Sequence, residues 1–272
     1  MRSYKTWGLV MAVALAACGL VYGIDGFQEN LQPYGTYYVH DPARPQPLVV
    51  TPGEPASPLP TTPPSDATVL FGGWDLDAWV GDNGAPTWRI EDGALVAVPG
   101  EGGIRTKERF GDIQLHLEWS APNPPVGTGQ DRGNSGVIIM NRYEIQILDN
   151  YNAQSYADGT AGALYGQWPP LVNALRPPGE WNTYDIIFTG PRWTDGELTR
   201  PAHATVLVNG VVVHNHQALL GAVAWRQVAQ YSPHPETETL SLQEHGHPVR
   251  FRNIWVRNIG EYDTGEPAPA TP

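Results

Sequence analysis

The chain has 272 residues, of which 41% are hydrophobic, and it carries 10 Trp and 12 Tyr. This is enough apolar side chain to fill a core, in one large β domain or two smaller domains. The net charge is −12, with only 16 Lys and Arg and no basic run, so no nucleic-acid partner is expected. The 30 Gly and 27 Pro favour many turns over long helices.

The first 18 residues have the pattern of a bacterial secretory signal. Arg2 and Lys5 precede an apolar run over 7–17, which ends in the tetrad Leu-Ala-Ala-Cys at 15–18. The tetrad resembles a lipobox, so we expect Cys18, the only cysteine, to be lipidated and to anchor the protein to a membrane. The expected location is the bacterial cell envelope, facing the periplasm or on the outer membrane. The alternative is an ordinary signal peptide or a short membrane anchor, but the apolar run is shorter than the about 20 residues that span a bilayer.

Residues 19–66 are expected to form a Pro-rich tether. From His40 onward a proline stands at nearly every second or third position, and proline neither continues a helix nor donates to a sheet. The sequence therefore predicts an extended, semi-rigid segment that holds a folded domain, 67–262, away from the membrane. The last residues, 263–272, are expected to be unstructured.

The predicted domain consists of many short strands separated by turns. Asp92-Gly93 and Asn209-Gly210 each lie between two apolar runs and are hairpin signals. Further strands are expected at 111–121, 134–140, 143–150, 181–190, 240–246 and 249–259. The segment 219–230 is ambiguous between helix and loop. Such a pattern is typical of an antiparallel sandwich or barrel, here a two-sheet sandwich with one partly open concave sheet.

The strand at 143–150 raises the question of function, because its polar face carries Glu144 and Gln146. Polar groups also share one face on three other expected strands. If these strands are neighbours, one cleft would collect Glu118, Glu144, Gln146, Gln243, His245 and Arg252. Solvent-facing strands are the alternative, yet those favour Thr, Lys, Ser and Arg, and these faces have no lysine. Carboxylates, an imidazole and amides could bind a hydroxyl-rich ligand or a divalent cation and could move protons.

Two loops add candidates. Residues 131–136, DRGNSG, could aim Arg132 and Asn134 into the cleft, although the glycines could equally be there for turn geometry. Residues 161–170 offer Tyr165, which could stack on a sugar ring, with core packing as the alternative.

Several motifs occur in a fixed order: LFGGWDLDAW, WRIEDGAL, GDIQLHLEW, RGNSGVIIMNRYEIQILDN, AGALYG, GEWNTYDIIF, VLVNGVVV and LSLQEHGHPVRFRNIWVR. Together they resemble the 3-keto-disaccharide hydrolase family over roughly residues 67–260. The resemblance implies an all-β, concanavalin A-like jelly-roll sandwich of two antiparallel sheets with a concave substrate cleft. Members of this family are often secreted bacterial lipoproteins, in line with the lipobox.

The resemblance also implies cleavage of glycosides that are already oxidised to a ketone at C3. The ketone acidifies the C2 hydrogen, so a base can form an enediolate that expels the C1 leaving group, and water then adds. Either a divalent metal ion or oriented hydrogen-bond donors would stabilise the charge, and no nucleotide cofactor is expected. Glu144, Glu118 and His245 are the candidates for acid, base or metal ligand. Hydroxyls or the ketone would be held by Gln146, Gln243, Asn134 and Arg252, with Tyr165 beside the sugar.

Other functions stay open. Retaining glucanases of the same fold carry two carboxylates on one strand in patterns such as Glu-x-Asp-x-Glu, whereas here Glu144 is followed by Gln146 and Leu148. A non-catalytic lectin-like module would use the same cleft without turnover. A cell-envelope adhesion or assembly protein is the third alternative.

Overall fold

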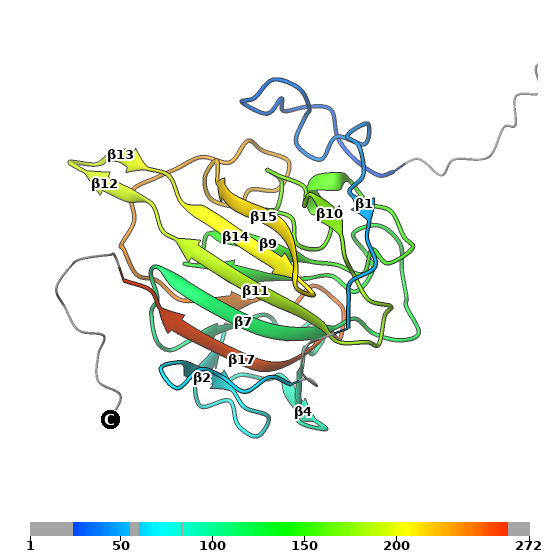
Figure 1. Cartoon of the computed structure of the whole chain (residues 1–272), viewed down its shortest axis with the longest axis vertical. Coiled ribbons are helices and arrows are strands. Elements are labelled where there is room, and N and C mark those ends of the chain that lie inside the picture. The colour runs from blue at the N-terminus through cyan, green and yellow to red at the C-terminus, as the bar shows by residue number, and fades with distance from the viewer. Residues whose placement is uncertain (1–23, 55–59, 83, 261–272) are drawn as a thin grey trace, which may run out of the picture.

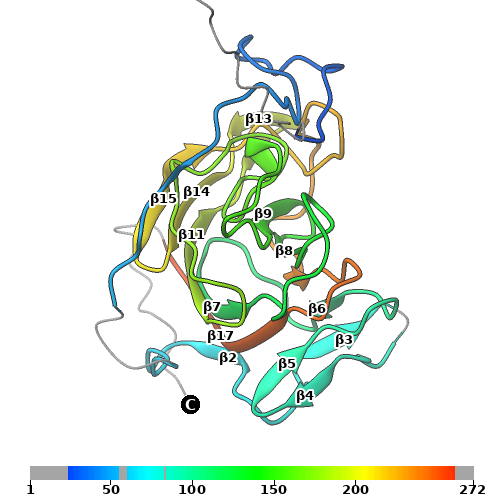
Figure 2. The ribbon, with the colours of Figure 1, turned by 90° about the vertical axis from the view of Figure 1, so that its right-hand side faces the viewer.

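The alternating strands form two antiparallel sheets in the computed structural model, which describes residues 24–54, 60–82 and 84–260 (Figures 1 and 2). Within these residues the only helical element is a single 3-10 turn, η1 (Ala157–Gly159). The expected all-β class and the two-sheet jelly-roll sandwich are confirmed.

The larger sheet has eight strands in the order β15-β14-β11-β7-β17-β5-β4, with β2 added beside β17. Its strands are β2 (Thr68–Phe71), β4 (Arg89–Glu91), β5 (Ala94–Val96), β7 (Ile113–Ser120), β11 (Asn182–Thr189), β14 (His203–Val208), β15 (Val211–Ala218) and β17 (Arg250–Asn258).

The smaller sheet has five strands in the order β3-β6-β16-β8-β9. Its strands are β3 (Trp79–Gly81), β6 (Ile104–Thr106), β8 (Ser135–Ile139), β9 (Tyr143–Ile147) and β16 (Ser241–Leu242). Two short pairs lie outside both sheets: β1 (Leu48–Val49) runs parallel to β10 (Val172–Asn173), and β12 (Arg192–Thr194) pairs with β13 (Glu197–Arg200).

The core lies between the two sheets and follows from the period-two alternation. On β7 the residues Ile113, Leu115 and Leu117 are fully buried, and Tyr143 on β9 is buried opposite them. The ring of Tyr143 lies 5.3 Å from that of Phe188 on β11, so the inner faces of the two sheets meet. Each fully buried side chain of this size stabilises the fold by roughly 1.5–3 kcal/mol.

Both predicted hairpins are present. Asp92 and Gly93 join β4 to β5, and Asn209 and Gly210 join β14 to β15. All four residues have positive φ angles, from 51° to 77°, as a two-residue turn of type I′ requires.

A β-bulge in β17 changes which residues face the core. Arg252 pairs with Glu118, but the next pairing to β7 is Trp255 with His116, so β17 contains one extra residue. Asn253, with φ 48°, occupies the bulge. Simple alternation would place Ile254 beside Arg252 on the polar face, and this is wrong, because the bulge turns Ile254 into the core.

The N-terminal segment (residues 24–54) packs against the sandwich and is therefore not an extended tether (Figure 1). Gln32, Val39, His40 and Asp41 are at most 4% exposed. Proline excludes regular helix here, but it does not prevent the side chains between the prolines from docking. The predictions for 1–18, Cys18, 19–23, 55–59 and 263–272 lie outside the described residues.

The ambiguous segment 219–230 contains neither helix nor strand and is a loop. Across 24–54, 60–82 and 84–260, no helix has the length and apolar character needed to span a bilayer.

Candidate active site

The polar face of β9 is not solvated. Tyr143, Ile145 and Ile147 point into the core, so Glu144 and Gln146 point outward from the smaller sheet. Residues 150–170, called the covering loop here, pack along this strand. Through it Gly162 and Tyr165 donate backbone hydrogen bonds to the carbonyls of Gln146 and Glu144. As a result Glu144 is only 6% exposed and Gln146 only 1%.

These two side chains form part of the lining of a cavity of about 540 Å³, a size typical of small-molecule sites. The lining residues are Gln130, Asn134, Ile138, Glu144, Gln146, Tyr156, Tyr165, Val223, Trp225, Gln243 and His245. Six of the eight candidates from the sequence are therefore brought together: Glu144, Gln146, Asn134, Gln243, His245 and Tyr165.

Glu144 has an unusual electrostatic environment. Burial raises the pKa of its carboxyl from 4.5 to about 8, because the charged form would lose its hydration. At neutral pH the side chain is therefore a neutral acid that faces the cavity. Gly136 on β8 makes room for it, since a Cβ at this position would lie 2.5 Å from Oε1 of Glu144.

An amide network forms a second wall. Gln146 donates from Nε2 to Oε1 of Gln130 at 3.0 Å, and Asn134 donates from Nδ2 to the carbonyl of Gln130 at 2.8 Å. Oε1 of Gln146 is buried and has no partner among the described residues. Such an unsatisfied acceptor costs about 1–3 kcal/mol, so a ligand hydroxyl that donates to it would bind favourably.

A tyrosine pair from the covering loop closes another side. The hydroxyls of Tyr156 and Tyr165 lie 2.8 Å apart. Burial raises the pKa of both phenols above the usual value, and the nearby Glu144 adds to the shift. Both are therefore neutral hydroxyls in the physiological range, able to donate and accept hydrogen bonds.

His245 and Gln243 lie beyond the end of β16. The backbone amide of Gln243 donates to the carbonyl of Gly136 at 2.9 Å, and the Ser135 hydroxyl donates to the carbonyl of Gln243 at 2.6 Å. These two hydrogen bonds extend the pairing between β16 and β8 by one residue, to Gln243, beyond the end of the two-residue strand β16. His245 lines the cavity but is exposed, so its ring is accessible to water.

The expectation that Glu118 and Arg252 share this cleft is wrong. They lie on β7 and β17 of the larger sheet and point outward from it, on the opposite side of the sandwich from Glu144. Arg252 donates from Nε to Oε2 of Glu118 at 2.7 Å, and its guanidinium lies 4.0 Å from the ring centroid of Trp181.

The hydrogen bonds on the outer face of the larger sheet also favour the ionised form of Glu118. Burial alone would raise the pKa of Glu118, but hydrogen bonds from His116, Arg252 and Asn253 outweigh it and hold the pKa below its usual value. Alternation identifies which residues face outward on a strand, but a sandwich has two outer faces, and the pattern does not distinguish them.

Sequence reasoning missed Gln130, Tyr156, Val223 and Trp225, all of which line the cavity. Trp225 is 62% exposed, which is unusual for a tryptophan, and it stands in the loop 219–230 that has no periodicity. A tryptophan in a segment without helix or strand periodicity was the sequence signal that could have identified Trp225 as a cavity residue. Arg132 does not enter the cavity lining, since its Nε donates to Asp149 at 2.8 Å.

The donors at the cavity do not form a typical divalent-metal centre. Of the lining residues, Glu144 is the only carboxylate and His245 the only imidazole. No group of three His, Cys, Asp or Glu side chains able to hold a metal ion occurs in the part of the chain that the structure describes.

Comparison with known proteins adds evidence to this geometry. A model of the 3-keto-alpha-glucoside-1,2-lyase-like domain family matches residues 66–257. A crystal structure from Parabacteroides distasonis, described as that of a candidate glycosyl hydrolase, is 43% identical with a TM-score of 0.72 and covers 79% of this chain and 93% of that one. A second such protein from the same organism, 21% identical with a TM-score of 0.52 over 72% and 94% of the two chains, supports the fold alone. Proteins of curated function gave no match.

Proposed function

Because the chain belongs to the 3-keto-alpha-glucoside-1,2-lyase-like family, we propose that this carbohydrate-active enzyme cleaves glycosides oxidised to a ketone at C3. The observation that carries this proposal is Glu144, a buried carboxyl that is neutral at physiological pH and faces a cavity of about 540 Å³. A positioned acid with a raised pKa is the group that an elimination needs at its leaving oxygen.

The chemistry runs in two balanced steps. A base removes the proton from C2, the electron pair forms the C1–C2 double bond, and the C1–O bond breaks while the leaving oxygen takes a proton from an acid. Water then adds across the double bond, with its hydroxyl at C1 and a proton at C2. The net reaction is hydrolysis, with no oxidant or reductant consumed.

We assign the acid to Glu144 and the base to His245. Glu144 holds a proton at neutral pH because it is buried, whereas His245 is exposed at the same cavity and can take the C2 proton. In the hydration step the roles reverse: Glu144, now ionised, accepts a proton from water, and His245, whose ring N–H exchanges with solvent between the two steps, donates a solvent-derived proton to C2. Loss of either group should reduce turnover about 10²–10⁴-fold.

Substrate binding is assigned to the amides and aromatic residues. The unpaired oxygen of Gln146 would accept from a sugar hydroxyl, and the neutral phenol of Tyr165 would donate to the C3 oxygen as negative charge develops there. Trp225 at the cavity offers an exposed ring for stacking on a pyranose face. Asn134 and Gln243 would bind further hydroxyls.

The decisive experiment is turnover of a 3-keto-glucoside and its unoxidised parent glucoside in D₂O. Elimination followed by hydration places deuterium at C2 of the product from the keto substrate, and the parent glucoside is left intact. Incubation of the product with enzyme and without it measures exchange that is not linked to cleavage. Cleavage of the keto substrate without deuterium at C2, or equal cleavage of the parent, would contradict the mechanism.

Two alternatives have weaker support. A retaining glucanase needs two carboxylates about 5–5.5 Å apart, and Glu144 is the only carboxylate in the described cavity lining. A lectin-like module would bind the keto substrate and the Glu144→Gln variant would bind it equally well, but neither protein would turn it over.

Dependence on a divalent metal remains a prediction from the family resemblance. It is tested by assay after treatment with EDTA and after addition of Mg²⁺, Mn²⁺ or Zn²⁺.

We further propose that the protein is held at the bacterial cell envelope by lipid at Cys18, in line with the lipobox at 15–18.

A further inference from the structure

We propose that the N-terminal segment completes the active site, and that His40 is a positioning residue for the Tyr156–Tyr165 pair. The segment lies outside residues 66–257, the part of the chain that matches the family model. The inference rests on the proposed function only in taking the cavity as the active site.

The segment is fastened to the covering loop by several kinds of contact. Gln32 donates from Nε2 to the carbonyl of Gly166 at 2.6 Å. The ring of Tyr34 stacks on Trp168 with centroids 4.4 Å apart. Further along the segment, β1 pairs with β10, which follows directly after the covering loop. These contacts hold the loop that carries Tyr156 and Tyr165.

The segment also contacts the loop 219–230 on another side of the cavity. Phe27 meets the ring of Trp225 edge-on, with centroids 5.9 Å apart, and the guanidinium of Arg226 lies 4.0 Å from the Phe27 ring centroid. Asn30 donates from Nδ2 to the carbonyl of Arg226 at 2.6 Å. Two walls of the cavity are thus supported by one segment.

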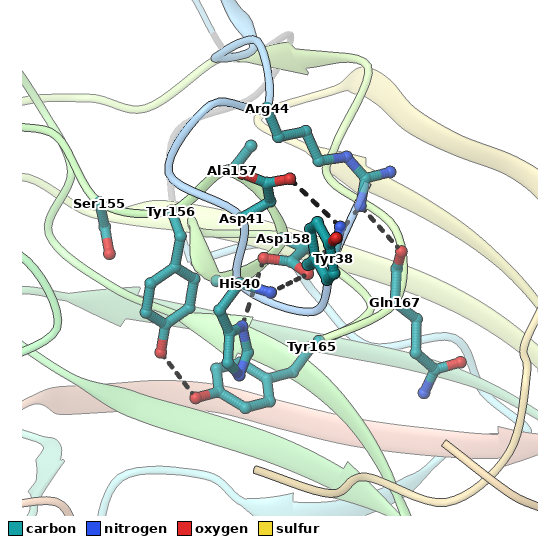
Figure 3. A network of polar contacts seen from close by, with 12 residues as sticks. Tyr38, His40, Asp41, Arg44, Ser155, Tyr156, Ala157, Asp158, Tyr165 and Gln167 are labelled. Carbon is teal, nitrogen blue, oxygen red and sulfur yellow. Dashed lines mark hydrogen bonds and ion pairs between the residues drawn. The ribbon is translucent and has the colours of Figure 1, made fainter. Parts of the chain in front are cut away.

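His40 is the point at which the segment reaches the tyrosine pair (Figure 3). Its side chain is fully buried, and its ring centroid lies 4.0 Å from that of Tyr156 and 5.0 Å from that of Tyr165. The imidazole therefore packs against both phenol rings, whose hydroxyls bond each other at 2.8 Å.

Asp158, in η1, fixes the orientation of His40. The backbone amide of His40 donates to Oδ2 of Asp158 at 3.0 Å, and Nδ1 of its ring lies 3.3 Å from Oδ1. Arg44 lies 3.9 Å from the same carboxylate. Across the described residues, every hydrogen bond and ion pair of this buried carboxylate comes from the N-terminal segment. The domain is therefore built to receive the segment, because a buried carboxylate needs such partners.

The backbone conformation at His40 indicates that this position requires the histidine side chain. His40 has a φ of 57°, a left-handed conformation that Gly or Asn adopts more readily. Its Nε2 is also buried without a partner in the described part of the chain. A residue that is unfavourable in both respects persists where the surroundings fix it, and such positions cluster at functional sites.

The test uses the full chain with His40→Asn and His40→Gly, and with His203→Asn as a matched control at a histidine outside the cavity lining. Asn tolerates the left-handed backbone and can still bond Asp158, but it lacks the ring, whereas Gly keeps the backbone alone. Hydrogen exchange by mass spectrometry follows the N-terminal segment and residues 156–167 separately. Steady-state kinetics on a 3-keto-glucoside give kcat and KM.

We expect His40→Asn to leave exchange in the N-terminal segment at the wild-type rate, to speed exchange in 156–167, and to lower kcat by about 10-fold to 100-fold. His40→Gly should speed hydrogen exchange in both the N-terminal segment and residues 156–167. His203→Asn should leave exchange in both regions at the wild-type rate. Wild-type kcat in His40→Asn would show that His40 is only a structural anchor and would overturn the assignment.

Exchange separates this inference from the proposed function. If wild type does not act on the keto substrate, faster exchange in 156–167 of His40→Asn still supports the positioning role. Unchanged exchange there in both His40 variants overturns the role whatever the substrate is.

Discussion

Glu144 stands on a strand face where a glutamate would ordinarily be hydrated, and the covering loop removes that water. The same carboxyl on an open sheet would be ionised at neutral pH and would serve only as a base or an ion-pair partner. Burial, with no cationic partner among the described residues, converts it into an acid. This environment, more than the residue type, distinguishes Glu144 from Glu118, which is also buried but is paired with Arg252.

The raised pKa of Glu144 predicts a pH dependence of stability. The folded state holds the proton up to about pH 8, whereas an unperturbed glutamate loses it near 4.5. The stabilising contribution is therefore fully present below pH 4.5 and is lost as pH rises through 8, by up to a few kcal/mol. Urea unfolding of wild type and Glu144→Gln from pH 5 to 9 measures it. The variant should lose this slope, and the exposed Glu101→Gln should keep it; equal slopes in wild type and Glu144→Gln would contradict the prediction.

The same group predicts the alkaline limb of activity. If Glu144 supplies a proton to the leaving group, kcat/KM on a 3-keto-glucoside should fall above about pH 8 as the carboxyl ionises. Glu144→Gln should reduce activity strongly at every pH and abolish this limb. An alkaline limb that is unchanged in the residual activity of the variant would assign it to another group.

Trp225 supports a prediction about binding alone. Its ring is 62% exposed, so Trp225→Ala removes little buried surface and should leave the melting temperature nearly unchanged. Loss of a stacking platform should raise KM by roughly 10-fold, corresponding to about 1–1.5 kcal/mol, with kcat little altered. Trp74→Ala, at a tryptophan that is 77% exposed and outside the cavity lining, is the control. Equal KM values in the two variants would remove Trp225 from the site.

At the scale of elements, the neighbouring strands β8 and β9 together form the floor of the cavity. They lie so close that Gly136 on β8 leaves no free space between its Cα and the side chain of Glu144 on β9. Gly136→Ala places a Cβ 2.5 Å from Oε1 of Glu144, so the carboxyl must move even though the strand can remain. We expect a loss of about 1–2 kcal/mol in unfolding free energy and a much larger relative loss of kcat. Gly53→Ala, where a Cβ would meet nothing within 4 Å, is the matched control. Wild-type kcat in Gly136→Ala would show that the position of the carboxyl is not critical.

The elements themselves were largely predictable because alternation and turn chemistry are local. The Asn209-Gly210 hairpin and the inward face of β7 follow from residues adjacent in sequence. Three features depend on distant contacts and were not predictable: the bulge at Asn253, the side of the sandwich on which Glu118 lies, and the docking of the N-terminal segment. Six of eight site candidates still converged, since β8, β9 and β16 are neighbours in one sheet.

For the whole molecule, the docking of the N-terminal segment changes how the domain would sit relative to a membrane. A Pro-rich tether over 19–66 would have held the domain far from a lipid at Cys18. With the chain packed from residue 24 onward, only 19–23 separate Cys18 from the folded part. Even fully extended, that connection reaches roughly 20 Å, so an anchored domain would lie close to the membrane surface.

Lipid anchoring is tested by expressing wild type and Cys18→Ser with the complete N-terminus in a bacterium and separating membranes from soluble protein. Wild type should sediment with membranes and be released by detergent, and its mature N-terminal peptide should begin at Cys18 with the added mass of acyl chains. Cys18→Ser should lose that mass and leave the membrane fraction, because the residue that would carry the acyl chains is gone. Its activity on a soluble 3-keto-glucoside should match that of detergent-released wild type, since the described site lies entirely within residues 24–260. Wild-type protein that is soluble, or that retains Met1–Lys5 in its mature form, would contradict the anchor and leave the catalytic proposal standing.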